Sequence, residues 1–191
     1  GGLGWGFNTP TATLIAAFET GDVRKTSTFF SRGDVLWDGY VCNNAAPNAY
    51  YNYKSYVSQT MESWGNNDWL ANKNLRVLRY ADVLLIHAEV ANENGKTADA
   101  IKSLNLVRTR AGLPNTTATS QAEVREAIYK ERFVEFAMEH DRVFDLRRQG
   151  RAGSVMRTHG KNYIDGVHDL YLIPQRQIDL SGGKMTQNPG Y

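Results

Sequence analysis

The chain has 191 residues with 22 basic and 20 acidic side chains, and its formal net charge of +2 is too small for a protein that tracks nucleic-acid phosphates. Its single cysteine, Cys42, excludes an internal disulfide framework and offers no cysteine metal cluster. No apolar run approaches the roughly 20 residues that a membrane-spanning helix needs.

The first 75 residues differ in composition from the rest. They carry 11 charged residues, whereas residues 76–191 carry 31, and they hold all four tryptophans and five of the ten tyrosines. Residues 38–75 have the weakest periodicity and are predicted to form long surface loops, which in a compact domain are often functional or poorly ordered. No linker rich in proline, glycine or serine separates the two parts, so residues 1–191 are expected to form a single domain.

Short elements are expected before the loops. Thr9-Pro10 predicts the start of a short helix that Gly21 ends. The β-propensity of residues 26–30 and 35–37 predicts a small hairpin that turns around Arg32-Gly33-Asp34.

Residues 79–112 predict a helical hairpin. A strongly apolar helix ends at Asn94-Gly95, and a second helix follows from Thr97 to Gly112. The unit has the length of a tetratricopeptide repeat. Because a lone repeat cannot bury its own hydrophobic face, part of that face is expected to lack a partner within this chain. The residues expected there are Leu84, Leu85, Leu104 and Val107.

A central helix is predicted over residues 120–148. Ser120 and Glu123 form a capping-box pattern at its start. Its apolar residues lie on more than one face, which indicates a helix with neighbours packed around it. Buried charges are tolerated when they are paired, so the sequence predicts structural ion pairs. The residues expected to form them are Glu131, Glu135, Arg142 and Asp145.

The C-terminal part is expected to be less regular. Residues 150–169 are predicted to be a loop, and residues 175–180 to form one helical turn. The fold class is therefore mainly α, with a tetratricopeptide-like helical hairpin packed on a central helix, long irregular loops and little β structure.

Several of these segments together resemble the C-terminal half of the SusD/RagB family. The resemblance rests on five segments in order and spacing: RYADVLLIHAE (79–89), LNLVRTRAGL (104–113), AIYKERFVEFAMEHDRVFDLRR (127–148), YLIPQRQI (171–178) and QNPGY (187–191). Two positions depart from the family pattern. His140-Asp141 stands where glycine often follows the last acidic residue, and Val143 stands where an aromatic residue often follows Arg142.

The resemblance implies a non-catalytic binding subunit without a cofactor. Members of this family are outer-membrane lipoproteins of Bacteroidetes that sit at the cell surface. They present glycans, or in some branches peptides, to a SusC-like TonB-dependent porin. The resemblance also implies that the N-terminal half, with its lipid anchor, is missing from this sequence. The alternatives are an oligopeptide-binding subunit of the same type of complex and a tetratricopeptide-like scaffold that binds protein tails.

The residue types that an enzyme would need are carboxylates and histidines. Glu131 and Glu135 lie one helical turn apart, with Cβ atoms about 5–6 Å from each other, which is near the spacing in retaining glycosidases. They share one helix with Arg132 rather than facing each other across a cleft, so structural ion pairing is favoured. The four histidines show no metal-ligand spacing. We therefore expect neither catalysis nor a metal site.

The aromatic residues of the first part are the candidate ligand-binding residues. Sugars present C–H faces that stack on indole and phenol rings, and hydroxyls that bond to nearby amides. The alternative is that these rings only fasten the loops to the helices. Trp5 is expected to be structural. The residues proposed to contact a neutral glycan are Trp37, Tyr40, Tyr50, Tyr51, Trp64 and Trp69.

Overall fold

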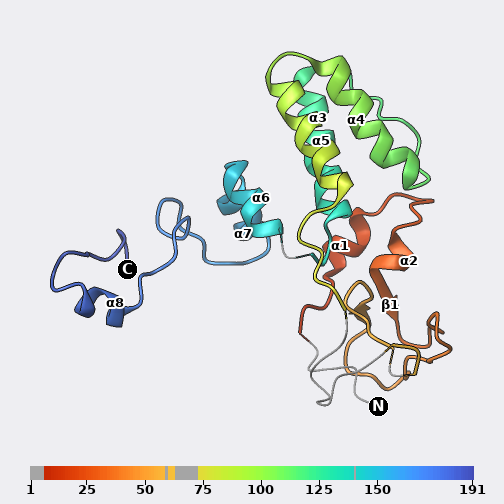
Figure 1. Ribbon diagram of the computed structural model, residues 1–191, viewed down its shortest axis with the longest axis horizontal. Coiled ribbons are helices and arrows are strands. Elements are labelled where there is room, and N and C mark those ends of the chain that lie inside the picture. Colours follow the sequence, from red (N-terminus) through yellow and green to blue (C-terminus); the bar gives the residue numbers. More distant parts are fainter. Residues whose placement is uncertain (1–6, 59, 63–72, 140) are drawn as a thin grey trace. The chain divides into compact units, whose positions relative to one another are not determined.

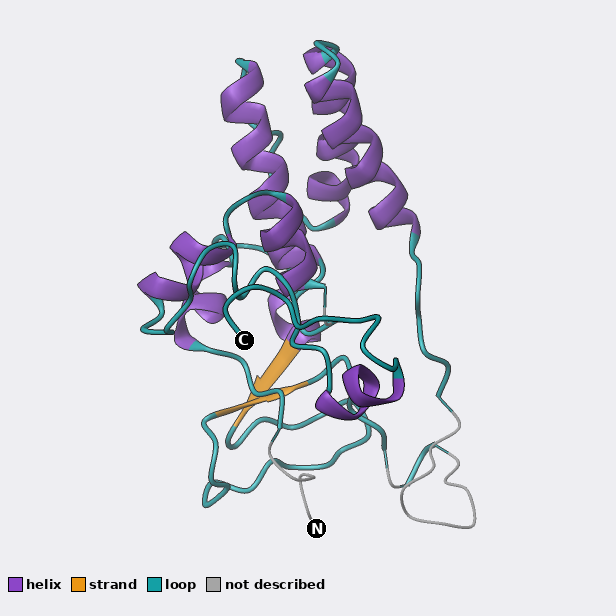
Figure 2. Cartoon of the chain, turned by 90° about the vertical axis from the view of Figure 1, so that its left-hand side faces the viewer, coloured by secondary structure: helices purple, strands orange, loops and turns teal. Residues whose placement is uncertain are grey.

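The computed structural model describes residues 7–58, 60–62, 73–139 and 141–191. They fall into two compact units, residues 1–139 and residues 140–191, which are described separately below. Helices predominate and only two short strands lie among the described loops (Figures 1 and 2), so the mainly α fold class is confirmed. No helix of the described chain is long and apolar enough to cross a membrane.

The helical hairpin and its packing on a third helix are confirmed. Helix α3 (Tyr80–Glu93) and helix α4 (Thr97–Arg110) are joined by a turn in which Gly95 has φ 74°. A residue with a Cβ would be strained in that left-handed conformation. Helix α5 (Gln121–Glu135) packs against both helices (Figure 1), and the three helices share one hydrophobic core.

The expected uncovered face of the hairpin was assigned to the wrong residues. Leu85, Leu104 and Val107 are at most 1% exposed, and Leu84 is partly buried, because α5 covers this side. Another side of α3 is exposed instead and carries a row of apolar side chains: Tyr80, Val83, Ile86 and Val90.

The central helix begins as predicted but ends earlier. The capping box of Ser120 and Glu123 is present. The helix stops at Glu135, whose carbonyl oxygen accepts hydrogen bonds from Lys54 Nζ at 2.9 Å and Arg79 Nη2 at 3.2 Å. A continuing helix would use that carbonyl for the N–H four residues on. Met138 then has φ 68°, so residues 120–148 are not one helix.

The N-terminal part of the first unit contains two short helices and a two-stranded sheet. Helix α1 (Ala12–Ala17) begins two residues past the predicted proline, with Thr11 as its N-cap, and helix α2 (Lys25–Thr28) follows. Strand β1 (Phe29–Ser31) pairs antiparallel with strand β2 (Tyr50–Asn52).

The predicted hairpin of residues 26–30 with 35–37 is therefore wrong. Val35 forms an isolated bridge with Val41 instead. The carboxylate of Asp34 accepts the Ser31 N–H at 2.7 Å and turns the chain away from β1. Such side-chain bonds compete with strand pairing.

The second unit contains three short helices, of which the first two contribute to a small core. Helix α6 (Arg142–Arg148), helix α7 (Ala152–Thr158) and helix α8 (Gln175–Leu180) follow one another along the chain. Helix α8 was expected, whereas α7 lies where a loop was predicted. The core of this second unit consists of Leu146, Ala152 and Tyr163. The expectation that the whole chain is one domain stays a prediction.

Candidate ligand-binding site

The most exposed described aromatic of the candidate set is Trp37, on the tip of a narrow loop. The flanking backbone is paired, with Cys42 N–H bonded to Asp34 C=O at 2.9 Å and the Val35–Val41 bridge next to it. At the tip, Leu36 N–H donates to Tyr40 C=O at 2.8 Å. We call residues 36–40 the Trp37 loop. Trp37 is 57% exposed.

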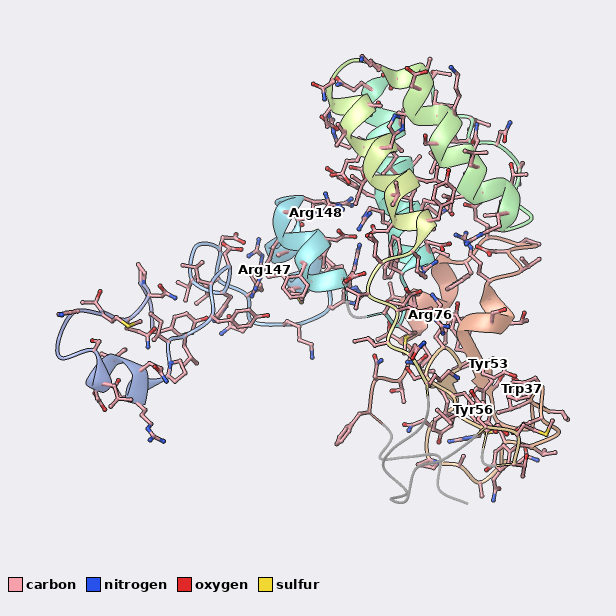
Figure 3. All side chains as sticks on the ribbon, viewed as in Figure 1. Trp37, Tyr53, Tyr56, Arg76, Arg147 and Arg148 are labelled. Carbon is pink, nitrogen blue, oxygen red and sulfur yellow. The ribbon has the colours of Figure 1, made fainter. Side chains whose placement is uncertain are left out.

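An aromatic cluster lies beside the Trp37 loop. The ring of Phe30 stacks on Tyr51 at a centroid distance of 5.6 Å and meets Tyr53 and Tyr56 edge-on at 5.4 and 6.0 Å. Leu36 is 5% exposed and packs into the same core. Figure 3 shows Trp37, Tyr53 and Tyr56 gathered at one end of the first unit. The loop therefore has an apolar anchor and an exposed ring.

Side-chain hydroxyls tie the loop to this cluster. The Trp37 backbone N–H donates to Tyr53 Oη at 3.0 Å, and Tyr56 Oη donates to Asp38 Oδ2 at 2.8 Å. Hydrogen bonds from the Ser58 hydroxyl, the Tyr56 hydroxyl and the Tyr40 N–H lower the pKa of the Asp38 carboxyl. Asp38 is thus held as a carboxylate by the protein itself.

The other predicted ring positions are less exposed. Tyr40 is half-buried beside Asp38, and Tyr50 packs edge-on against Phe29 at 6.0 Å. Tyr51 is 5% exposed, and its hydroxyl accepts the Asn48 N–H at 3.0 Å, so its ring has no free face for a ligand. Trp64 and Trp69, and also Trp5, lie outside the described residues.

Three residues that hold the site were not predicted from the sequence. Asp38, Tyr53 and Tyr56 support the Trp37 loop through the bonds given above. Tyr53 and Tyr56 belong to the same aromatic, asparagine-rich stretch as the chosen candidates. Their spacing carries no periodic signal that would separate a ring beneath the loop from a ring on it.

Glu135 lies within a group of guanidinium groups at the end of α5. Its Oε2 accepts from Arg24 Nη1 at 2.9 Å and from Arg110 Nη2 at 2.5 Å, and its Oε1 accepts from Arg79 Nη1 at 2.7 Å. Burial raises the pKa of this carboxyl, but the hydrogen bonds from Arg110, Arg79 and Arg24 outweigh it and lower the pKa to about 2. Glu135 therefore stays ionised at neutral pH.

Glu131 is bound in the same way one turn earlier. Its Oε1 accepts from Arg24 Nη1 at 2.6 Å, and its Oε2 accepts from Arg108 Nη1 at 3.1 Å. Arg24 also binds Asp22 at 2.7 Å, so one guanidinium joins three carboxylates. Both carboxylates of the glycosidase-like pair are occupied by cations from other elements. The lowered pKa of Glu135 keeps this carboxyl out of the protonated form that a general acid needs.

The other two predicted ionic residues lie on α6. Asp145 is 5% exposed and accepts from Arg148 Nε at 2.8 Å. Arg142 is partly buried, and burial together with the charge of Arg151 lowers the pKa of its guanidinium.

Groups typical of catalytic or metal sites are engaged elsewhere or lie apart. His87 Nδ1 lies 2.8 Å from the Ser103 hydroxyl, which links α3 to α4. Cys42 is fully buried, and burial raises the pKa of its thiol. Within the described part of the chain, no three His, Cys, Asp or Glu side chains gather as they do around a metal ion.

The chain was then compared with known proteins. The model of the SusD family matches residues 37–191. SusD-like protein P2 of Formosa agariphila is 26% identical over an alignment of 215 residues, which covers 100% of this chain and 41% of that protein.

Solved structures are also similar to this chain. A laminarin binding SusD-like protein matches with a TM-score of 0.78 and 30% identity, over 98% of this chain and 39% of that one. The surface glycan-binding protein A from Bacteroides thetaiotaomicron matches with a TM-score of 0.76 and 27% identity, over 94% of this chain and 40% of that one. The chain thus spans about two fifths of the length of these relatives.

Proposed function

The chain belongs to the SusD family, and from this premise we propose that it is part of a glycan-binding subunit of a polysaccharide uptake complex. The observation that carries this proposal is the exposed indole of Trp37 on a loop held by its neighbours. An indole face stacks on the C–H face of a sugar ring. Trp64, Trp69 and the partly exposed Tyr40 stay part of the proposed site.

The ligand that fits best is a neutral oligosaccharide or polysaccharide. The Trp37 loop offers an aromatic ring, and its one carboxylate, Asp38, is already bonded within the protein. A cationic ligand would have to displace those bonds. Because each stacked ring contributes only about 0.5–1.5 kcal/mol beyond its area burial, the affinity is expected to be weak, in the micromolar to millimolar range. Weak binding suits a protein that passes its ligand on.

The wider setting is part of the proposal. The full-length protein is placed at the cell outer membrane, held by an N-terminal lipid and paired with a SusC-like TonB-dependent porin that takes up the glycan. Catalysis has no role in this function, because binding and transfer require none. Co-purification of a porin with the full-length protein from outer membranes is the expected result. A protein recovered without a porin would contradict this part of the proposal.

The binding experiment uses the full-length protein and a panel of polysaccharides, including laminarin, in affinity electrophoresis and calorimetry. Trp37→Ala is expected to weaken glycan binding by several-fold up to about tenfold, as the loss of one stacked ring predicts. Val35→Ala is the matched control, since Val35 is 68% exposed on the same hairpin but carries no ring. Binding of peptides alone would favour the oligopeptide-binding alternative. Glycan binding that Trp37→Ala leaves unchanged would remove Trp37 from the site.

A further inference from the structure

Three tyrosines within six residues of the chain each bond to a loop through the side-chain hydroxyl. Tyr51 Oη accepts the backbone N–H of Asn48 at 3.0 Å, and Tyr53 Oη accepts that of Trp37 at 3.0 Å. Tyr56 Oη donates to Asp38 Oδ2 at 2.8 Å. All three rings contact Phe30. The packed end of each ring is thus fixed in one cluster, while its polar end reaches a loop.

Two of these hydroxyls reach successive residues of the Trp37 loop. The internal bonds of the loop, from Leu36 N–H to Tyr40 C=O at 2.8 Å and from Gly39 N–H to Leu36 C=O at 2.9 Å, define its shape but not its direction. The Tyr53 and Tyr56 bonds connect it to the cluster on the side of Trp37 and Asp38. Together they hold the backbone from which the Trp37 indole projects.

We propose that Tyr53 and Tyr56 are positioning residues that hold the Trp37 indole in its ligand-binding orientation before the ligand arrives. This inference rests on the proposed glycan-binding function. A loop that must be ordered during binding spends part of the binding free energy on lost conformational freedom, and a loop that is already ordered does not. The two hydroxyls therefore raise affinity without touching the ligand.

The test uses conservative variants of the full-length protein. Tyr53→Phe, Tyr56→Phe and the double variant keep the rings in the cluster and remove only the hydroxyls. Tyr51→Phe is the matched control, because it removes a hydroxyl from the same cluster that reaches Asn48 rather than the Trp37 loop. If Tyr56→Phe does not fold, Asp38→Ala breaks the same bond from the loop side.

The first measurement needs no ligand. The protein is labelled with 5-fluorotryptophan, and the ¹⁹F signal of Trp37 is assigned as the one lost in Trp37→Phe. In the double variant this signal is expected to broaden or shift, and in Tyr51→Phe to stay as in the wild type. An unchanged Trp37 signal in the double variant would overturn the inference, whatever the ligand proves to be.

The second measurement is glycan affinity. Each single variant is expected to bind about two- to tenfold more weakly, the fold-change that corresponds to one net hydrogen bond. On a Trp37→Ala background the same changes are expected to have no further effect, because the indole they orient is absent. An equal loss on both backgrounds would overturn the positioning role. If Trp37→Ala does not weaken binding, the proposed site fails, while the ¹⁹F result still decides whether the hydroxyls hold the loop.

Discussion

The helices α3–α5 and the aromatic loops around Phe30 are built from different interactions. The helices bury a continuous apolar core, and buried carboxylates of α5 bind arginines from other elements. The loops have one two-stranded pairing and are held by a stacked aromatic cluster and by tyrosine hydroxyls. The comparison indicates that the helices supply most of the global stability, while the loops are ordered locally around the exposed ring.

The largest loss of unfolding free energy is expected from Glu135→Ala. The Glu135 side chain is 1% exposed and binds three arginines, of which Arg24 is itself largely buried. Breaking a buried pair from one side costs roughly 3–5 kcal/mol, because the remaining charge is left uncompensated. Urea unfolding followed by circular dichroism measures this loss.

The surface pair of Glu93 and Arg125 is the control for that variant. Its side chains are 42% and 33% exposed, so Glu93→Ala is expected to shift the urea midpoint far less. Equal shifts for the two variants would show that the buried ion pairs of Glu135 do not stabilise the packing of the helices.

The next largest effect is the loss of stability at low pH that Glu135 causes. The pKa of Glu135 is lowered from 4.5 to about 2 on folding. A carboxyl whose pKa is lower in the folded state stabilises the fold at any pH above its pKa in the unfolded state. That stabilisation is lost as the pH falls from about 5 toward 2. The loss from this one group is on the order of 3 kcal/mol. In Glu135→Gln, unfolding free energy measured against pH is expected to decline less steeply over this range. An unchanged slope would assign the acid sensitivity to other carboxyls.

The sequence predicted the helices better than their ends. The Asn94-Gly95 turn and the apolar periodicity are local signals, so α3 and α4 were found within one or two residues. The end of α5 was missed because Lys54 and Arg79, distant in sequence, bind the Glu135 carbonyl.

The strand pairing and the loop site depend on contacts that sequence patterns do not encode. Residues 29–31 pair with residues 50–52 because Phe30 and Tyr51 share one cluster, and neither strand has a periodic pattern of useful length. The aromatic composition of the first part of the chain indicated Trp37 as a ligand-binding residue. It could not indicate which tyrosines lie under the loop, because Tyr51 and Tyr53 are alike in sequence and differ only in where their hydroxyls reach.

A loop-specific variant sharpens the comparison. Phe30 is 5% exposed and contacts three tyrosines, so Phe30→Ala is expected to cost about 3 kcal/mol within the aromatic cluster. Because this cluster is separate from the core of α3–α5, the cost is expected to appear as local opening. Hydrogen exchange should quicken in residues 29–56, with amide protection in α3 kept. Equal loss of protection in both regions would mean that the loops and the helices unfold as one.

The smallest loss of stability is expected from the helix caps of α5 and of α1, a short helix outside the hydrophobic core of α3–α5. Ser120 Oγ accepts the Glu123 N–H at 3.3 Å at the start of the fifteen-residue α5, and Thr11 Oγ1 accepts the Leu14 N–H at 3.2 Å at the start of the six-residue α1. Loss of such a cap costs typically about 1 kcal/mol. Because α5 lies within the main helical core, Ser120→Ala is expected to lower the global unfolding free energy by about that amount. Thr11→Ala should act mainly on local exchange in α1, since a helix that short can open without the core. A larger global loss from Thr11→Ala than from Ser120→Ala would place the main source of stability in the N-terminal part of the first unit rather than in α3–α5.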